Sequence, residues 1–206
     1  MWVTSCLKPQ FPQISGGYGK GKCGTSFGVV ACAPLWVGAG GWDVIHFNWG
    51  LHDVCPLVKP QLAAQLGSGY AAVTEAQYVA NLEALYQQLK RAVAPKGTLI
   101  WCSTTPVPVT YHGRNNSDVV LINKLARTLF GPGSKHPEVL VHDLYTEVVD
   151  KCRADFPKSA SYPQGAACTY QNNGVHFGHE GENSTGKRLT ASWVVDAIKP
   201  HLKKPA

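Results

Sequence analysis

The chain has 206 residues, of which 44% are hydrophobic and 16% are charged, and it contains 21 glycines. This composition excludes a disordered chain, which would be richer in charge, and a coiled coil, which would be poorer in glycine, and no apolar run is long enough to predict a membrane span. The formal net charge is +6, but the basic residues are scattered and are not interleaved with aromatic residues, so we expect no nucleic-acid partner.

Strands and helices are predicted to alternate along most of the chain. In chain order, the predictions are a strand over 43–48, a helix that follows the capping box Thr74–Gln77 and ends before a turn at 95–97, a strand over 98–102, a helix from 117 or 118 to 129, a strand over 138–142, a helix over 144–152, and a last helix through 189–198 that stops at Pro200. Such alternation is typical of an α/β sandwich with a parallel sheet. Functional sites in these sheets lie at the carboxyl ends of the strands.

The seven cysteines form no C-x-x-C pair, so their spacing does not indicate a zinc ribbon or a thioredoxin-type motif. Cys152 and Cys168 flank a polar loop, and Cys23 and Cys32 bracket a short segment. Either pair is placed to close a loop as a disulfide. Cys102 lies in an apolar run, and we expect it to be a small buried hydrophobe.

The cellular compartment is indicated only indirectly. Two glycosylation sequons, at 115–117 and 183–185, agree with the cysteines in favouring a secreted protein in an oxidising environment. Residues 1–6 lack the basic and apolar pattern of a signal peptide, which points the other way. Taken together, these features weakly favour a secreted, extracellular protein.

Two short polar blocks follow predicted elements of the fold. Residues 48–53 read Asn-Trp-Gly-Leu-His-Asp after the first predicted strand, and residues 172–177 read Asn-Asn-Gly-Val-His-Phe before the last predicted helix. Together with the segment 101–108, Trp-Cys-Ser-Thr-Thr-Pro-Val-Pro, these blocks resemble the SGNH (GDSL-type) hydrolases, a superfamily of esterases and lipases. The resemblance covers residues 13–202 in the order of strands and helices.

The resemblance implies a three-layer α/β/α sandwich with a flavodoxin-like parallel sheet, in a single SGNH hydrolase-like domain over residues 1–206. It implies an esterase that hydrolyses O-acyl esters through a Ser/His mechanism, with a small-molecule or acetylated carbohydrate ester as substrate. No cofactor and no metal belong to this chemistry. The family needs a hydroxyl nucleophile, a histidine base and donors aimed at the developing oxyanion.

The base and its partner are carried over from the family's Asp-x-x-His block. His176 matches the histidine base. Asn173 stands where the family has the aspartate, and an amide can orient an imidazole but cannot stabilise the imidazolium that forms. Glu180 is a nearby carboxylate that could replace the missing charge.

The oxyanion and substrate-binding positions are carried over in the same way. Gly16 or Gly17 matches the glycine of the family's second block, and Gly50 matches the glycine of the third block, Gly-x-Asn-Asp. His52 stands at the asparagine of that third block, where a neutral imidazole can donate one hydrogen bond. Asn48 is a further donor, with pinning of the backbone after the strand as its alternative role.

The remaining side chains of these segments have structural interpretations. We expect Asp53 to accept hydrogen bonds from loop amides rather than to react. Trp49 and Trp101 are interpreted as core or pocket wall, and Ser26 with Thr25 as a helix cap. Residues 56–69 are a candidate flap over the site.

The nucleophile block, Gly-Asp-Ser, does not occur in the chain. A strand, its catalytic turn and the next helix cannot fit before residue 13, so we expect a domain that is N-terminally incomplete and a sheet that lacks its first strand. Ser15, just before Gly16, is the candidate for a shifted nucleophile, although it lies close to the third block for the family's geometry. Without that block, the assignment as a serine esterase stays open.

Two other functions compete with the esterase. A non-catalytic SGNH-like module could bind a carbohydrate or acyl ligand, with Trp49, Tyr111 and His112 as pocket wall. A metal protein could use His-x-x-His and nearby carboxylates, namely His176, His179, Glu180 and Glu182. A glycine between the two histidines argues against a helix that presents both, so we favour the esterase.

Overall fold

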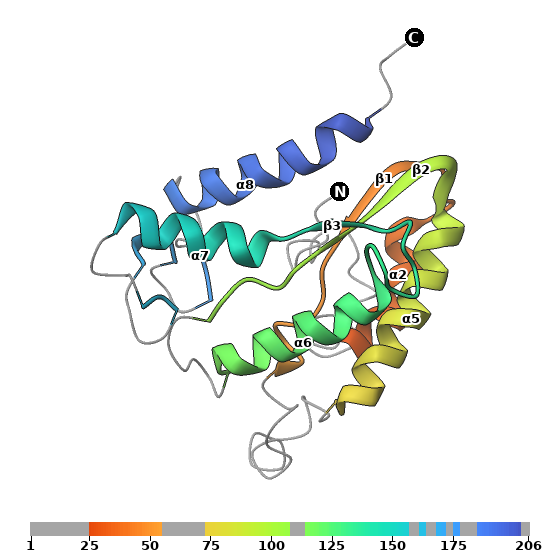
Figure 1. The fold of residues 1–206 in the computed structure, drawn as a ribbon. Coiled ribbons are helices and arrows are strands. Elements are labelled where there is room, and N and C mark those ends of the chain that lie inside the picture. The colour runs from red at the N-terminus through yellow and green to blue at the C-terminus, as the bar shows by residue number, and fades with distance from the viewer. Residues whose placement is uncertain are drawn as a thin grey trace.

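The computed structural model describes residues 25–54, 73–107, 114–156, 161–163, 168–171, 175–177 and 185–202 (Figure 1). A three-stranded parallel sheet of order β1-β2-β3 lies within this part of the chain. Its strands are β1 (Trp42–Phe47), β2 (Val93–Cys102) and β3 (Leu140–His142). The helices are α2 (Ser26–Val37), α5 (Glu75–Ala92), α6 (Asn116–Leu129), α7 (Leu144–Asp155) and α8 (Thr185–Ile198), with 3-10 helices η3 (Thr169–Gln171) and η4 (Lys199–His201). The α/β class is therefore confirmed.

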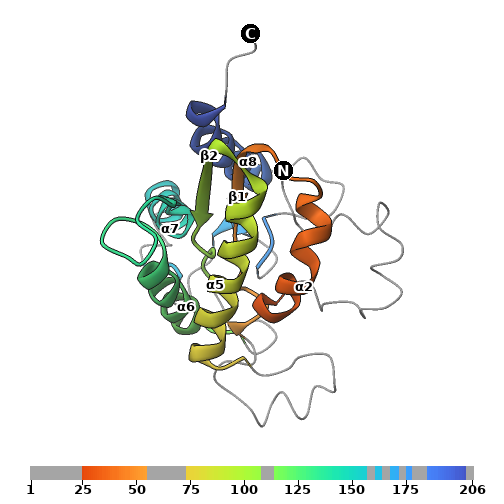
Figure 2. The same cartoon turned by 90° about the vertical axis from the view of Figure 1, so that its right-hand side faces the viewer.

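The helices pack on the sheet and on one another in two groups. Figure 2 shows α6, α5 and α2 side by side in front of β1 and β2, and α5 packs against α2, α6 and β2. Helices α7 and α8 form a second pair that runs side by side in Figure 1. None of the described helices is long and apolar enough to cross a bilayer.

Helix α5 forms where the capping box predicts it. Thr74 Oγ1 accepts a hydrogen bond from the Gln77 amide at 3.2 Å, and Gln77 Oε1 accepts one from the Thr74 amide at 3.0 Å. This reciprocal pair satisfies two amides that the first turn would otherwise leave free. The predicted cap at the start of α2 is also confirmed, because Thr25 Oγ1 accepts a hydrogen bond from the Gly28 amide at 3.1 Å.

Strand β2 differs from its prediction at its start. The predicted turn at 95–97 lies inside the strand, because Val93 already pairs with Trp42 and the register shifts before the next pair, Val44 with Thr98. A β-carbon on Gly97 would lie 2.6 Å from the Trp42 carbonyl oxygen, so glycine lets the strands approach at this irregularity. Pairing with β1 thus overrides the local turn signal.

The core lies between the sheet and α5 and α6. Trp101, the second-last residue of β2, is fully buried, which confirms its placement in the core, and Phe47 packs edge-on against Phe130. Trp49 is also buried and stacks on Trp36 with ring centroids 5.7 Å apart. Both tryptophans therefore belong to the core, and Trp49 also lines a pocket beside α2 and β1, so it fits both interpretations of the sequence.

The cysteines follow the sequence-based expectations where the structure describes them. Cys152 and Cys168 form a disulfide that joins α7 to the segment before η3. Cys102 is a free, buried thiol, as expected. Cys32 is disulfide-bonded, and Cys23 lies outside the described residues.

Candidate functional site

The turn that follows β1 is the centre of the candidate site. It bends at Gly50, whose carbonyl oxygen accepts hydrogen bonds from the amides of Asp53 at 2.8 Å and Val54 at 3.1 Å. A β-carbon on Gly50 would lie 2.4 Å from Ile122 Cδ1 and 2.6 Å from Thr104 Oγ1. Glycine is therefore required here because it lets the turn pack directly onto α6.

Asp53 anchors the end of this turn. Its two carboxylate oxygens lie 2.9 and 3.0 Å from the Ser26 amide nitrogen, and Ser26 Oγ donates to Oδ1 at 2.8 Å. Burial raises the pKa of Asp53 to about 6, although the hydrogen bonds from Ser26 oppose this shift. Asp53 thus accepts a backbone amide, but this amide belongs to the first residue of α2, where the sequence predicted loop amides, and the contact ties the turn to that helix.

Asn48 joins the ends of two strands. Its side-chain nitrogen donates to the Cys102 carbonyl oxygen at 2.6 Å and to Thr104 Oγ1 at 3.1 Å. An amide group carries two hydrogens, and both have partners within the fold. Of the two roles that the sequence left open for Asn48, these contacts favour the pinning of the backbone.

His52 lies in the same turn and is held neutral. Burial lowers the pKa of His52, and the charge of Arg114 and the nearby His176 lower it further. Its Nδ1 is buried and has no hydrogen-bond partner among the described residues. A neutral imidazole keeps one N–H donor, which is the property that an oxyanion-binding histidine needs.

His176 approaches His52 from the far end of the chain. Its side chain is exposed, while the preceding Val175 is buried in the main core and Phe177 packs against the second hydrophobic cluster. These apolar neighbours hold the segment in place and leave the imidazole accessible. Because the charge of His176 helps to lower the pKa of His52, the histidines of the two sequence blocks lie in the same region of the fold.

Arg114 is the residue of this site that the sequence did not single out. It is 7% exposed, and its Nε donates to the Leu51 carbonyl oxygen at 2.7 Å. Within the described part of the chain, no carboxylate pairs with it. It precedes α6, and a cation at a helix N-terminus is unfavourable, which is the one sequence signal that could have marked it.

Several predicted site residues lie outside the described residues. These are Ser15, Gly16, Gly17 and Asn173, together with Glu180, His179, Glu182, Tyr111, His112 and the segment 56–69. The described site therefore consists of His52, His176 and Arg114 around the turn that Gly50 shapes. Searches with the sequence matched no protein-family model and no curated protein.

Proposed function

We propose that this chain is an SGNH-type esterase domain that hydrolyses O-acyl esters, such as acetylated carbohydrates, on a three-layer α/β/α fold with a flavodoxin-like sheet. The observation that carries the proposal is the turn after β1, where Arg114 donates to the Leu51 carbonyl and where the charges of Arg114 and His176 act on His52 to lower its pKa further than burial alone does. Beyond its nucleophile, acyl transfer requires a base and donors aimed at the oxyanion, and a histidine base, a neutral histidine donor and an arginine can supply these groups.

His176 is the general base of the proposed reaction. Its exposed imidazole takes the proton of a serine hydroxyl while the oxygen attacks the ester carbonyl. The tetrahedral intermediate then expels the alcohol, which receives that proton, and water hydrolyses the acyl-enzyme by the same steps. Ser15 is the candidate nucleophile in this chain.

His52 and Arg114 stabilise the oxyanion of the tetrahedral intermediate. Arg114 acts twice, because its charge attracts the developing oxyanion and also adds to the effect of burial, which lowers the pKa of His52 and keeps that imidazole a neutral donor. Loss of one oxyanion-hole donor typically lowers kcat by about 10²–10³-fold. Each of the two residues is assigned an effect of this size.

The rate of this esterase is expected to be low because Asn173 replaces the family's aspartate. In a Ser-His-Asp triad, replacing the aspartate with asparagine lowers kcat by about 10⁴-fold. This substitution and the missing Gly-Asp-Ser block favour the second candidate function, a non-catalytic module that binds a carbohydrate or acyl ligand. The two functions differ in turnover, which a single assay measures.

The test is hydrolysis of p-nitrophenyl acetate by the purified chain and by His176→Ala. His201→Ala, which changes a histidine of η4, is the matched control for general imidazole catalysis. We expect His176→Ala to lose the activity and His201→Ala to retain it. Equal rates in all three proteins would overturn the catalytic role of His176. Tight binding of an acylated sugar without turnover would replace the esterase with the binding module.

The nucleophile is tested separately with a fluorophosphonate probe that labels activated serines. Peptide mapping of the labelled chain should place the adduct on Ser15. Ser15→Ala should then abolish labelling, whereas Ser192→Ala on the exposed face of α8 should not. Labelling that survives in Ser15→Ala would contradict the assignment of Ser15.

A further inference from the structure

A second cluster of reactive side chains lies where the three strands end. His46 belongs to β1, and Cys102 and His142 are the last residues of β2 and β3. Cys102 pairs directly with His142, and His46 pairs with Ile100, two residues before Cys102, so all three side chains lie on one face of the sheet. One nitrogen of each histidine and Cys102 Sγ lie within 4.8 Å of one another.

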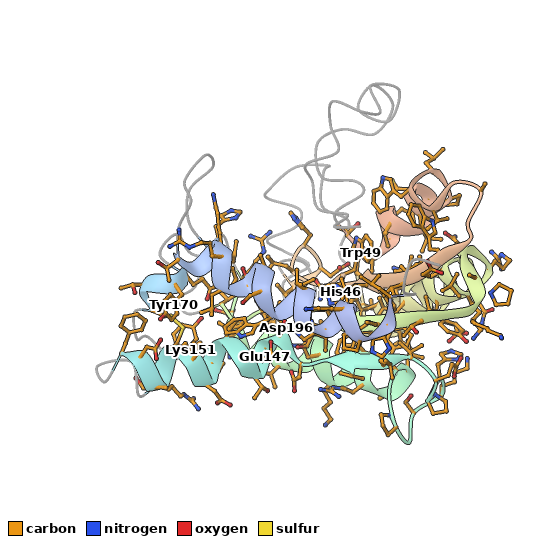
Figure 3. All side chains as sticks on the ribbon, turned by 90° about the horizontal axis from the view of Figure 1, so that it is seen from above. His46, Trp49, Glu147, Lys151, Tyr170 and Asp196 are labelled. Carbon is orange, nitrogen blue, oxygen red and sulfur yellow. A yellow bond between two sulfur atoms is a disulfide. The ribbon has the colours of Figure 1, made fainter. Side chains whose placement is uncertain are left out.

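The two imidazoles form a chain of hydrogen bonds that ends on a carboxylate. His142 Nε2 lies 3.0 Å from Glu147 Oε2, in the first turn of α7, and His142 Nδ1 lies 2.9 Å from His46 Nε2. In Figure 3, the labelled His46 and Glu147 mark the two ends of this chain. An ionised carboxylate only accepts hydrogen bonds, so His142 Nε2 carries a hydrogen; in the neutral form of this ring, its Nδ1 lone pair then accepts the hydrogen of His46 Nε2.

We propose that this cluster is a binding site for a zinc-class divalent metal ion, held by His46 Nε2, His142 Nδ1 and the Cys102 thiolate. The ion takes the place of the hydrogen between the two rings, and the hydrogen of His46 Nε2 moves to Nδ1 of the same ring. Cys102 loses its thiol proton to solvent, so one proton is released for each ion bound. A water molecule completes a four-coordinate shell.

The ligand set and the surrounding charge both favour such an ion. Two imidazoles and one thiolate are typical ligands of Zn²⁺. Burial, with the negative charges of Glu147 and Asp143, raises the pKa of the Cys102 thiol. The two carboxylates that disfavour a bare thiolate would stabilise a divalent cation at the same position.

The spacing of the two nitrogens is close to that of a tetrahedral zinc site, and Cys102 Sγ, within 4.8 Å of them, would move to about 3.6 Å on binding. Zn–N bonds of about 2.0–2.1 Å place two ligand nitrogens about 3.3 Å apart, so the rings must separate by roughly 0.4 Å from their present 2.9 Å. Glu147 already holds the remaining N–H of His142, which is the outer-shell carboxylate that zinc-bound histidines commonly have. His142 is 4% exposed and Glu147 41%, so the carboxylate marks the side from which an ion would enter.

No short sequence motif indicates this site, and no metal was expected from the sequence. The three ligands come from three separate strands, and only the parallel register brings them together. The competing interpretation is a structural histidine pair beside a buried hydrophobic thiol. Metal binding by the intact chain separates the two interpretations.

The experiment titrates Co²⁺ into the full chain after dialysis against a chelator, with the disulfides left oxidised. We expect a thiolate-to-cobalt charge-transfer band that saturates at one equivalent and is displaced by Zn²⁺. Cys102→Ser should abolish the band, and His46→Ala and His142→Ala should each weaken binding by at least about 100-fold, the upper end of the range for lost supporting contacts. His201→Ala on η4 is the matched control and should bind normally.

Glu147→Gln tests the carboxylate that holds the His142 ring. The new amide oxygen accepts the His142 N–H less strongly than the carboxylate does, so we expect metal affinity to fall about 10–100-fold.

A second measurement uses only the wild-type chain, in case a variant fails to fold. The histidine ring nitrogens are followed by NMR, and Zn²⁺ should shift His46 Nε2 and His142 Nδ1 but not the His201 ring. A charge-transfer band that persists in Cys102→Ser, or no band and no ring shift in the wild-type chain, would overturn the proposal.

Discussion

Replacing Gly50 with alanine should destabilise the fold by about 2–3 kcal/mol, because the new methyl group has no room. It would lie 2.4 Å from Ile122 Cδ1 and 2.6 Å from Thr104 Oγ1, so each atom must move by about 1 Å to restore ordinary contacts. Ile122 is fully buried, and Thr104 Oγ1 already accepts a hydrogen bond from Asn48. Neither side chain can move without disturbing the core or the anchor of the turn.

Two further variants isolate the clash in urea denaturation. Gly133→Ala is the matched control, because Gly133 has a φ of +77° and nothing within 4 Å of a β-carbon, so only the backbone cost of about 1 kcal/mol applies. Ile122→Val removes the clashing Cδ1 and by itself should cost about 1 kcal/mol. In the Gly50→Ala background it should cost much less, with a coupling free energy of about 1 kcal/mol.

The double-mutant cycle decides whether this steric reasoning holds. Additive effects of Gly50→Ala and Ile122→Val, within about 0.5 kcal/mol, would show that the two side chains do not compete for the same space. A Gly50→Ala variant no less stable than Gly133→Ala would refute the clash altogether. Additivity would mean that the loss of stability in Gly50→Ala arises in the backbone of the turn. Equal stability of Gly50→Ala and Gly133→Ala would mean that the turn shifts to make room for the methyl group.

Three other predictions follow from single contacts. Arg114→Gln should raise the pKa of His52 toward its ordinary value, because the guanidinium charge helps to lower it; NMR titration of the ring checks this, and an unchanged pKa would contradict it. Replacing Cys152 and Cys168 with alanine should lower the free energy of unfolding by about 3 kcal/mol, since the disulfide closes a loop with a sequence separation of 16, and urea denaturation measures it. Burial raises the pKa of Asp53 from 3.8 to about 6, so its contribution to stability is full below pH 3.8 and is lost as pH rises through 6. Relative to Asp53→Asn, the wild-type chain should therefore lose about 2 kcal/mol between pH 4 and pH 6, out of about 3 kcal/mol over the full pH range, and parallel pH profiles would refute this.

Local signals in the sequence predicted the elements whose stabilising contacts are themselves local. The Thr74–Gln77 capping box predicted the start of α5 because both of its hydrogen bonds lie within one turn. The pairing of Cys152 with Cys168 was one of two disulfides suggested by cysteines that flank a short segment of chain, and the structure contains it. The start of β2 at Val93 escaped prediction because pairing with β1 determines it, while Pro95 and Gly97 locally favour a turn.

The residues of the candidate site also differ in whether a local sequence pattern identifies them. His52 and His176 were recognisable because each lies in a short block with a characteristic neighbour pattern. Arg114 escaped prediction because its role depends on burial and on its approach to the Leu51 carbonyl, which no local pattern encodes. Asn48 was assigned two roles, and only the positions of Cys102 and Thr104 favour one of them.

A hydrogen bond connects the candidate ester site with the proposed metal site at the end of the sheet. Asn48, at the start of the turn that carries His52, donates to the carbonyl oxygen of Cys102, whose thiol belongs to the proposed metal site. That bond uses the main-chain carbonyl, which every residue type supplies, so Cys102→Ser removes a metal ligand but leaves the anchor of the turn in place. Asn48→Ala does the reverse, because it frees the turn and keeps the thiol. Substitutions on either side of this one hydrogen bond can therefore assign an observed effect to the ester site or to the metal site.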